Sequence, residues 1–511
     1  MDSLETNDQL TIVNRSMEHR ISKKLIRKVP YFEKMLSHEC LESKENKVEL
    51  DFEEKALKSF LDWIELGYIF IEMDYIIDLC TILDYFGTKN HLIQDCFSYF
   101  SEKFSSEYLP VVIPQVTSTS ALINSDTLDT FICRYFSKIA NTNVWLDYPI
   151  ETIEYICALD LMIHSEYQVF HAIMKWIDFK ADSRKRYFKG LLNLVRWCHL
   201  EDNDLSKIKE NELYESSDLE PESGSHCKSS CNCGFKRTKQ GCFFAIEELN
   251  NKLFRVKVLD GNFRPLFNEV IQLDESLPLN LLYGKYISDI PLDSGRQMIR
   301  IDWKQNKYRL LNFDSYKRHY VEIHRLIFGS QNSVESYIEK KKTDDLSTMS
   351  IYKTLLLEAA EKYIFVCSDD YEFKCWVNPS THGIYFAFDF DGLTHLATVL
   401  DNNVYVLTSD LKFFQFNIDR NMFEKIELPS VENKLKFDNL ILTSKQAGDG
   451  GVILIDKSAK DVFCFNVSTR RWKSVGRIID CKSEYNVLKT FTFGFVSTDS
   501  INLCLERKLT Q

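Results

Sequence analysis

The sequence is short of glycine, proline and long apolar runs. Its 511 residues include only 17 glycines and 10 prolines, which excludes a collagen-like or Pro/Gly-rich low-complexity chain. No apolar run reaches the ~20 residues that a transmembrane helix needs, and the best candidate, residues 68–83, is interrupted by Glu72, Asp74 and Asp78. The amino terminus, MDSLETNDQL, is polar and acidic and lacks the apolar segment of a secretory signal. We therefore expect a cytoplasmic protein with no membrane partner.

Familiar catalytic motifs are absent as well. The sequence contains no G-x-S-x-G, H-E-x-x-H or G-x-G-x-x-G pattern. Gly284-Lys285 resembles the end of a phosphate loop, but Leu279 replaces the upstream glycine that lets the backbone amides of such a loop surround a phosphate. Catalytic groups that are distant in the sequence can still converge, so an enzyme housed in the C-terminal half stays an alternative. The simpler expectation is a protein with no catalytic residues and no cofactor.

What the chain does contain is an ordinary globular composition. Hydrophobic residues make up 44% and charged residues 27%, and the length suffices for about three domains of ~150 residues. The 63 Lys and Arg against 75 Asp and Glu give a net charge of -12, so the chain as a whole carries no signature of nucleic-acid binding. The 15 cysteines are scattered, many of them in apolar stretches, which indicates buried thiols in a reducing compartment.

The first 212 residues combine a small α/β unit with a helical region. Residues 8–13 and 48–50 have strand-like patterns, and apolar residues at helical spacing begin at Glu53. Gly67 is expected to cap that first helix. Residues 125–200 are almost purely helical in pattern, with apolar stripes separated by short polar turns, as in antiparallel helix pairs.

A charged segment separates this part from the rest of the chain. Residues 201–222 hold nine acidic residues and two lysines, and we interpret residues 213–242 as a linker. Five potential zinc ligands lie toward its end: His226, Cys227, Cys231, Cys233 and Cys242. Their C-x3-C-x-C spacing differs from the paired C-x2-C of most zinc sites, and a polar linker offers few side chains to orient the ligands. Exposed thiols are favoured over an ordered zinc site, and no metal is assigned.

Beyond residue 242 the chain changes to short aromatic and β-branched runs, which indicates all-β structure. In this half, a turn-forming or polar residue is repeatedly followed six positions later by an aromatic residue. The pairs are Lys257 and Phe263, Asp302 and Tyr308, Asn417 and Phe423, and Asn466 and Trp472, with Asn378 and Tyr385 one position longer and Ile338 lacking the aromatic. The six positions lie 45, 36, 40, 39 and 49 residues apart, a mean of about 42, which is typical of one propeller blade per repeat. We predict a six-bladed propeller over residues 243–511, closed by strands near residues 491–505.

These three regions, in this order, resemble the kelch-like family, whose members combine a BTB domain, a BACK helical domain and a kelch propeller. The segment LMIHSEYQVFHAIMKWIDFKADSRKRYFKGLLNLVR carries the most specific similarity, to the BACK signature. The matching residues are Leu161, Ser165, Glu166, Val169, Phe170, Trp176, Arg184, Leu191, Leu192, Val195 and Arg196. The BTB resemblance rests on PYFEKML at 30–36, on residues 48–71 and on Cys96, whereas His19-Arg20 lies two residues too far upstream of the family's His-Arg position.

The propeller departs most from the family. Kelch repeats carry a Gly-Gly doublet after their second strand, and this chain has none in that place, because Gly450-Gly451 precedes a strand instead. Residues 326–329, Leu-Ile-Phe-Gly, are the nearest relic, in a strand-like run. The resemblance thus implies a degenerate kelch propeller. Trp303, Trp376 and Trp472 are expected to pack between its blades.

The resemblance implies a multidomain architecture and a function. It places an α/β BTB domain at residues 1–107, an all-α BACK domain at 108–212, the linker at 213–242 and an all-β propeller at 243–511. It also implies a non-catalytic substrate adaptor of a cullin-three RING ubiquitin ligase, which forms a homodimer through BTB and binds a protein substrate through the propeller. The alternative is a cytoskeletal scaffold that binds actin filaments and has no ligase role.

The resemblance also assigns contacts to individual residues. In cullin-binding BTB domains a hydrophobic residue, any residue and a glutamate follow the YF helix, and Cys40, Leu41 and Glu42 are similar here. The dimer interface would draw on Leu10, Ile12, Phe32 and Leu36. Glu166 and Arg196 are expected to have structural roles, as helix caps and ion-pair partners between helices. The substrate-binding residues of the propeller are unknown.

Overall fold

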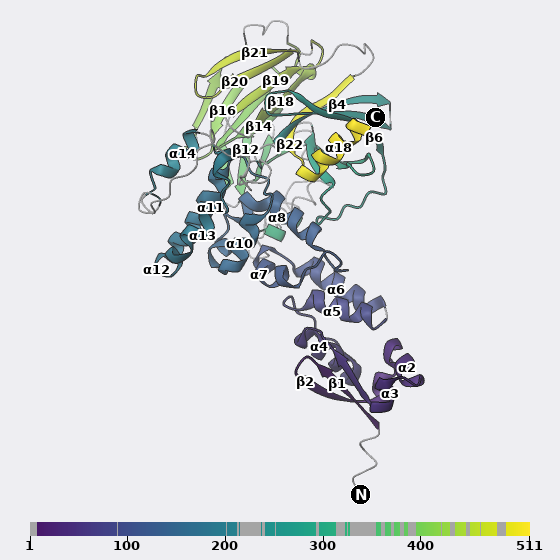
Figure 1. The fold of residues 1–511 in the computed structure, drawn as a ribbon. Helices are drawn as coiled ribbons and strands as arrows, with labels where there is room; N and C mark the ends of the chain where they lie inside the picture. Colours follow the sequence, from purple (N-terminus) through teal and green to yellow (C-terminus); the bar gives the residue numbers. More distant parts are fainter. Residues whose placement is uncertain are drawn as a thin grey trace. The chain divides into compact units, whose positions relative to one another are not determined.

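The structure is a computed structural model of the whole chain (Figure 1). The residues that it describes are 8–88, 90–200, 202–211, 214, 237, 241–250, 252–292, 296–312, 322–323, 325–327, 354–358, 363–368, 373–378, 383–386, 395–420, 422–429, 435–445, 450–459, 461–477 and 487–510. The chain divides into two compact units, Met1–Asp129 with Leu326–Gly329, and Thr130–Arg325 with Ser330–Gln511. Within the described residues, no helix combines the length and apolarity needed to span a bilayer.

The first unit is an α/β unit built on a three-stranded sheet. The central strand β1 (Gln9–Asn14) pairs antiparallel with β2 (Met17–Ser22) and parallel with β3 (Lys47–Leu50). Short to medium helices lie between β2 and β3 and after β3 in the chain. They are α1 (Lys23–Ile26), α2 (Pro30–Ser37), α3 (Leu41–Glu45), α4 (Glu54–Leu66), α5 (Ile76–Tyr85), α6 (Asn90–Lys103) and α7 (Leu109–Val112).

Helix α4 shows how the sequence sets the limits of an element. The Glu53 carboxylate accepts a hydrogen bond from the Ala56 backbone N–H at 2.7 Å and so caps the first turn. Gly67 follows the last turn with a φ of 84°, a left-handed conformation in which glycine has no steric penalty. The buried face includes Leu57, Phe60 and Ile64, at the spacing predicted from the sequence.

The second unit begins with a helical region. Its helices are α8 (Ser125–Ile139), which runs across the division between the units, α9 (Asn143–Asp147), α10 (Ile150–Ala158), α11 (Glu166–Phe179), α12 (Ala181–Arg184), α13 (Phe188–Leu192) and α14 (Asp202–Lys209). Two tryptophans tie α9 and α11 together, because the Trp145 indole donates to the Ala172 carbonyl at 3.0 Å and the Trp176 indole donates to the Tyr148 carbonyl at 2.8 Å. The apolar stripes predicted for α8 and α11 are buried.

The C-terminal half is a β-propeller, as predicted. The strands are β4 (Gly241–Asn250), β5 (Leu253–Leu259), β6 (Pro265–Leu273), β7 (Ile287–Leu292), β8 (Gln297–Asp302), β9 (Lys307–Leu311), β10 (Thr354–Glu358), β11 (Tyr363–Ser368), β12 (Phe373–Asn378), β13 (Gly383–Phe386), β14 (His395–Leu400), β15 (Asn403–Thr408), β16 (Phe413–Asn417), β17 (Met422–Ile426), β18 (Leu440–Lys445), β19 (Gly451–Asp456), β20 (Asp461–Asn466), β21 (Arg471–Arg477) and β22 (Val487–Phe495). Strands β10–β13, β14–β17 and β18–β21 form three four-stranded sheets. The remaining strands form a seven-stranded sheet in the order β22-β4-β5-β6-β9-β8-β7.

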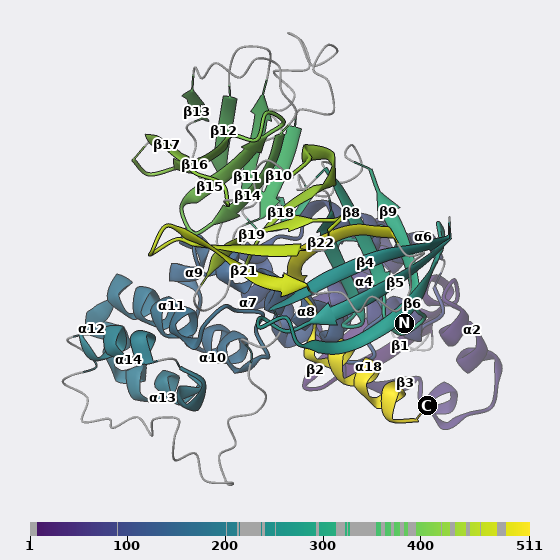
Figure 2. The same ribbon diagram turned by 90° about the horizontal axis from the view of Figure 1, so that it is seen from above.

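The last strand closes the ring on the first. Strand β22 pairs antiparallel with β4 from Val487 opposite Glu248 to Phe495 opposite Gly241, and the two run side by side in Figure 2. Gly241 lies at the end of this pairing, where an added Cβ would lie 2.7 Å from the Phe493 ring and would have to displace it. Closure by a strand around Phe491 is therefore confirmed. The blade count stays a prediction, because Ile338, the marker of one predicted blade, lies outside the described residues.

The repeat has a physical cause in the hairpins that end the blades. Asn417 and Asn466 each accept a hydrogen bond from the backbone N–H three positions later, at 2.8 and 2.7 Å, which closes a turn after the third strand. The aromatic residue six positions on then faces the residue before the asparagine, so that Phe423 pairs with Phe416 and Trp472 with Phe465. The Trp472 ring also packs 5.4 Å from Phe413 of the neighbouring sheet, as expected for a residue between blades.

Two local predictions in this half are wrong. Residues after Phe495 were expected to continue as strand, but Thr498–Thr510 form helix α18, which lies next to β6 (Figure 1). Its inward residues Ile501 and Cys504 pack into the core of the seven-stranded sheet at helical spacing. Leu326 and Ile327 were taken for a kelch strand, but they lie in a helical turn of the first unit, where Ser106 Oγ donates to the Ile327 carbonyl at 2.6 Å.

Ring closure yields a stability prediction. The Phe491 side chain is 1% exposed and stacks 5.3 Å from Phe243 of β4. We expect Phe491→Ala to lower the free energy of unfolding by about 3–5 kcal/mol, because it leaves a large cavity at the seam. Urea titration monitored by intrinsic fluorescence measures this change. Phe179→Ala is the control, since that ring is 49% exposed, and it should cost about 0.5 kcal/mol. Equal losses in the two variants would contradict the assignment of the seam.

Candidate partner-binding surface and a buried ion pair

The predicted cullin contact lies at the start of helix α3. Cys40 is the N-cap, with its backbone N–H donating to Ser43 Oγ at 3.2 Å and its thiol donating to the Met35 carbonyl at 3.5 Å. Leu41 and Glu42 follow in the first turn, where Leu41 is 66% exposed and Glu42 is exposed. The three residues are therefore adjacent on a short ordered helix, with an apolar side chain and a carboxylate open to solvent. Binding through this surface stays a prediction.

The residues predicted for the dimer interface have a different environment. Leu10 and Ile12 on β1 and Phe32 on α2 are each 0% exposed within their own unit, and only Leu36 is half-buried. Leu10 and Ile12 are two positions apart on the central strand, so both point to the same covered face of the sheet. In the single chain these three side chains belong to the core and offer no surface to a second copy. The dimer interface itself stays a prediction.

Sequence reasoning did not single out another exposed apolar group in the same unit. Leu66, the last residue of α4, is 56% exposed, and Tyr68 and Phe70, which follow the helix, are 53% and 51% exposed. The Tyr68 and Phe70 rings lie 5.2 Å apart, edge to face. The only signal in the sequence was the interrupted apolar run from residue 68 to residue 83.

Of the five potential zinc ligands, Cys242 lies within the described residues. His226, Cys227, Cys231 and Cys233 lie outside the described residues. Cys242 is 0% exposed in β4 and packs in the core of the seven-stranded sheet, where burial raises the pKa of its thiol to about 12. Cys242 is thus a core residue. Within the described ranges, no group of three or more His, Cys, Asp or Glu side chains is arranged to hold a metal ion.

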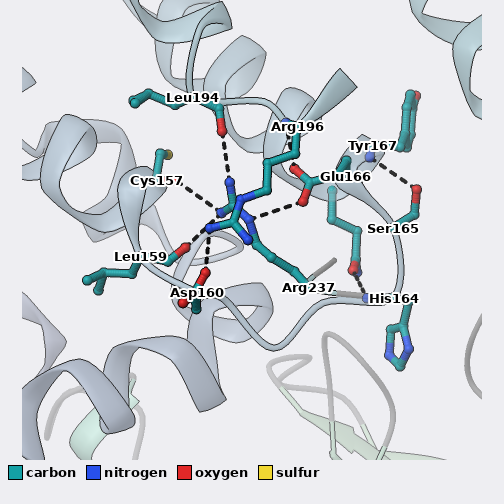
Figure 3. A network of polar contacts seen from close by, with 11 residues as sticks. Cys157, Leu159, Asp160, His164, Ser165, Glu166, Tyr167, Leu194, Arg196 and Arg237 are labelled. Atoms are coloured by element: carbon teal, nitrogen blue, oxygen red, sulfur yellow. Dashed lines mark hydrogen bonds and ion pairs between the residues drawn. The ribbon is translucent and has the colours of Figure 1, made fainter. Parts of the chain in front are cut away.

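Glu166 lies at the centre of a buried polar network in the helical region (Figure 3). Ser165 caps α11 by accepting a hydrogen bond from the Tyr167 backbone N–H at 3.1 Å. The next residue, Glu166, is 0% exposed, and its carboxylate accepts from the Arg196 backbone N–H at 3.1 Å. The Arg196 side chain instead pairs with Asp160. Both residues thus have structural roles, as the sequence suggests, but the two side chains do not pair with each other.

The side-chain partner of Glu166 is Arg237, a residue that the sequence places in the linker. Arg237 is 1% exposed, and its Nε lies 3.1 Å from the Glu166 carboxylate (Figure 3). The rest of the guanidinium donates to the carbonyls of Cys157 and Leu159 at 3.0 Å each, and of Leu194 at 2.8 Å. Arg237 thus bridges the end of α10, the start of α11 and the segment after α13.

Burial dominates the electrostatics of this pair. It raises the pKa of the Glu166 carboxyl and lowers the pKa of Arg237, and each partner opposes the shift of the other. Arg196 also favours the ionised carboxylate, whereas Asp160 disfavours it. The buried carboxylate therefore depends on Arg237 to stay ionised. Sequence reasoning missed Arg237 because a lone arginine in a polar, charged segment gives no sign of burial.

A second buried ion pair lies in the propeller. Arg300 on β8 and Asp289 on β7 are joined by two parallel hydrogen bonds of 2.8 Å, and both side chains are almost completely buried. Tyr283 packs against this pair, with its ring centroid 4.7 Å from the Arg300 guanidinium and 5.7 Å from that of Arg134 on α8. Arg134 also donates to the Asp289 carbonyl at 2.9 Å. One cluster thus links the first helix of the helical region to the propeller.

Comparison with known proteins shows similarity over part of the chain. The sequence model of the BACK family, "BTB And C-terminal Kelch", matches residues 119–210, which include Glu166 and Arg196 and end before Arg237. Kelch-like protein 28 of Mus musculus is 24% identical over 184 residues, which are 35% of this chain and 32% of that protein. Kelch-like protein 24 of Rattus norvegicus is 27% identical over 169 residues, 32% of this chain and 28% of that protein. The chain thus matches about a third of the length of these curated relatives.

Among solved structures, apo AztD from Citrobacter koseri aligns with a TM-score of 0.22 and 8% identity, over 49% of this chain and 62% of that protein. A similarity of this size carries no argument about fold or function.

The ion pair predicts a pH-dependent loss of stability. We expect Arg237→Gln to cost about 3–5 kcal/mol near neutral pH, because it leaves a buried carboxylate without its cation. The pKa of Glu166, already raised in the folded state, rises further in this variant. A raised carboxyl pKa penalises folding above the ordinary carboxyl pKa of 4.5 and not below it, so the loss should shrink as the pH falls from neutral toward 4.5. Urea titrations followed by circular dichroism measure the free energy of unfolding of the native protein and of the variant across this pH range.

The double variant Glu166→Gln/Arg237→Gln is the matched control. Because it has no carboxyl at position 166, its loss relative to the native protein should lack the pH dependence of the single variant. A constant loss for Arg237→Gln across this pH range would contradict the role of Arg237 as the cation that keeps Glu166 ionised.

Proposed function

Because the chain belongs to the kelch-like family of BTB-BACK-kelch proteins, we propose that it is a substrate-recognition adaptor of a cullin-three RING ubiquitin ligase. In this proposal the first unit binds the cullin and the propeller binds a protein substrate. The chain itself performs no chemistry, because ubiquitin transfer belongs to the RING partner and its E2. The adaptor contributes proximity and orientation, which convert an encounter between separate molecules into a reaction within one complex.

The observation that supports this proposal is the exposure of Leu41 and Glu42 together at the start of α3. Burying a leucine side chain at an interface contributes about 1.5–3 kcal/mol, which suits an anchor surrounded by polar contacts. Glu42 lies next to it and can fix the register of a partner helix through a charge-assisted hydrogen bond. Cys40, whose thiol is turned to the Met35 carbonyl, holds the turn that presents both side chains.

Two further features belong to the proposal. The chain forms a homodimer through its first unit, and a bivalent complex gains avidity for a substrate with two binding sites without any new contact. The propeller offers loops at the ends of its sheets, and loops on a rigid scaffold are where binding residues gather. The protein acts in the cytoplasm, and its partners are proteins rather than nucleic acid or membrane.

A charge reversal at Glu42 tests the cullin contact. We expect Glu42→Lys to weaken binding of purified cullin-three N-terminal domain at least tenfold, because the substitution removes the carboxylate and places a cation beside Leu41. Glu45→Lys is the matched control, since it makes the same exchange at an exposed position at the other end of α3, and it should bind within about twofold of the native protein. Isothermal titration calorimetry measures the affinity, and light scattering checks that both variants keep the native oligomeric state.

Affinities that agree within error for the native protein and Glu42→Lys would remove this contact. If the native protein binds no cullin and co-sediments with actin filaments, the adaptor role itself is wrong and the scaffold alternative takes its place.

A further inference from the structure

The connection between the helical region and the propeller is anchored next to the propeller. Tyr214, after α14, is 6% exposed, with its ring 5.7 Å from that of Trp197. The next described residue, Arg237, is buried beside Glu166 and precedes the first propeller strand, β4, by only four positions. Arg237 therefore belongs to the packed helical region, although it lies at the end of the segment that joins the two parts.

Chain length alone shows why this anchor matters. Residues 215–236 number 22, and an unconstrained tether of that length would separate its ends by about 26 Å on average. Four residues, in contrast, reach at most about 14 Å even when fully extended. Fixing Arg237 on the helical region therefore holds Gly241, and with it the start of β4, within a short distance of Glu166.

Two other contacts join the helical region to the same sheet. The Arg134 guanidinium of α8 donates to the Asp289 carbonyl on β7 at 2.9 Å. The His164 ring, which precedes α11, lies 5.1 Å from the Phe495 ring at the end of β22. Strands β7, β22 and β4 all belong to the seven-stranded sheet that closes the ring. Three separated points of attachment are sufficient to fix one body on another.

We propose that the Glu166–Arg237 pair is a positioning contact that locks the propeller onto the helical region, so that the two move as one rigid body. This inference goes beyond the proposed function and holds for any partner of the propeller. It assigns Arg237 a role in setting the orientation of the propeller, in addition to its contribution to the stability of the helical core.

The network itself explains why arginine is suited to this position. Arg237 uses its planar guanidinium to reach one carboxylate and three backbone carbonyls at once. Lysine carries a single ammonium group and cannot span these acceptors. Because the acceptors come from three segments of the helical region, the direction of the Arg237 side chain is fixed.

The test measures a distance across the junction in the full chain. Spin labels are attached to non-natural amino acids at Asp182 on α12 and at Met422 on β17, both exposed, so that the native cysteines stay untouched. Pulsed electron paramagnetic resonance then gives the distribution of distances between the labels. We expect a narrow distribution for the native junction and a distribution about twice as wide or wider for Arg237→Gln. Without Arg237, the preceding described residue that packs in the helical region is Tyr214, which lies 27 positions before Gly241.

Arg184→Gln is the matched control for a loss of stability alone. Arg184 is a buried arginine of the helical region that donates to the carbonyls of Leu146 and Trp176, at 2.8 and 2.6 Å, both within that region. It should lower stability and leave the distribution narrow. The double variant Glu166→Gln/Arg237→Gln removes the buried charge together with the anchor, and we expect it to keep the broad distribution even where it is more stable than Arg237→Gln. This variant also provides the measurement if Arg237→Gln does not fold.

Several results would overturn the inference. A narrow distribution in both variants that lack Arg237 would show that the other two contacts suffice. Equal broadening in Arg184→Gln would show that the width follows stability rather than the anchor. Neither result bears on cullin binding, so failure here and failure of the proposed adaptor role are distinguishable.

Discussion

The pairing of β22 with β4 is the constraint on which the C-terminal half depends. It joins residues 487–495 to residues 241–250 and turns a row of sheets into a closed ring. An open β4 would present unpaired backbone groups along one edge, which favours aggregation. The closed seam instead covers that edge and brings the rings of Phe243, Phe491 and Phe493 together. The same seam adjoins the helical region, because Phe495 of β22 contacts His164, and Arg237, four positions before β4, pairs with Glu166.

The sequence predicted the helices with regular apolar spacing and the repeated hairpins of the propeller. Helical spacing located α4 and α11, and the interval between a turn residue and an aromatic residue located the hairpins of the propeller. The hairpin signal works because one asparagine closes the turn and sets which residues face each other across it. Features that occur once were harder to predict. The α18 helix was taken for strand because Phe491, Phe493 and Phe495 just before it alternate, and the helical pattern that follows is short.

The residues of the candidate sites were also predicted only in part from the sequence. The resemblance to known BTB domains located Leu41 and Glu42, and the structure exposes both. It also assigned Leu10, Ile12 and Phe32 to a dimer interface, which stays a prediction; within the single chain all three are core residues of their own unit. An apolar residue in a sequence indicates burial but not which elements cover it. Arg237 illustrates the opposite case, because composition assigns a charged residue to solvent, while its three carbonyl acceptors and Glu166 compensate its burial.

The two strands that close the ring lie at opposite ends of the propeller sequence, so β4 is synthesised well before its partner β22. Val487 follows Asn250 by 237 positions, so at ribosomal rates of about 5–20 residues per second β4 waits roughly 10–50 s for its partner strand. During translation, its apolar residues Phe243 and Ala245 lack the side chains of Leu488, Phe491 and Phe493 that later cover them. Nascent chains of this protein should therefore engage holding chaperones during elongation, until release from the ribosome lets the seam form.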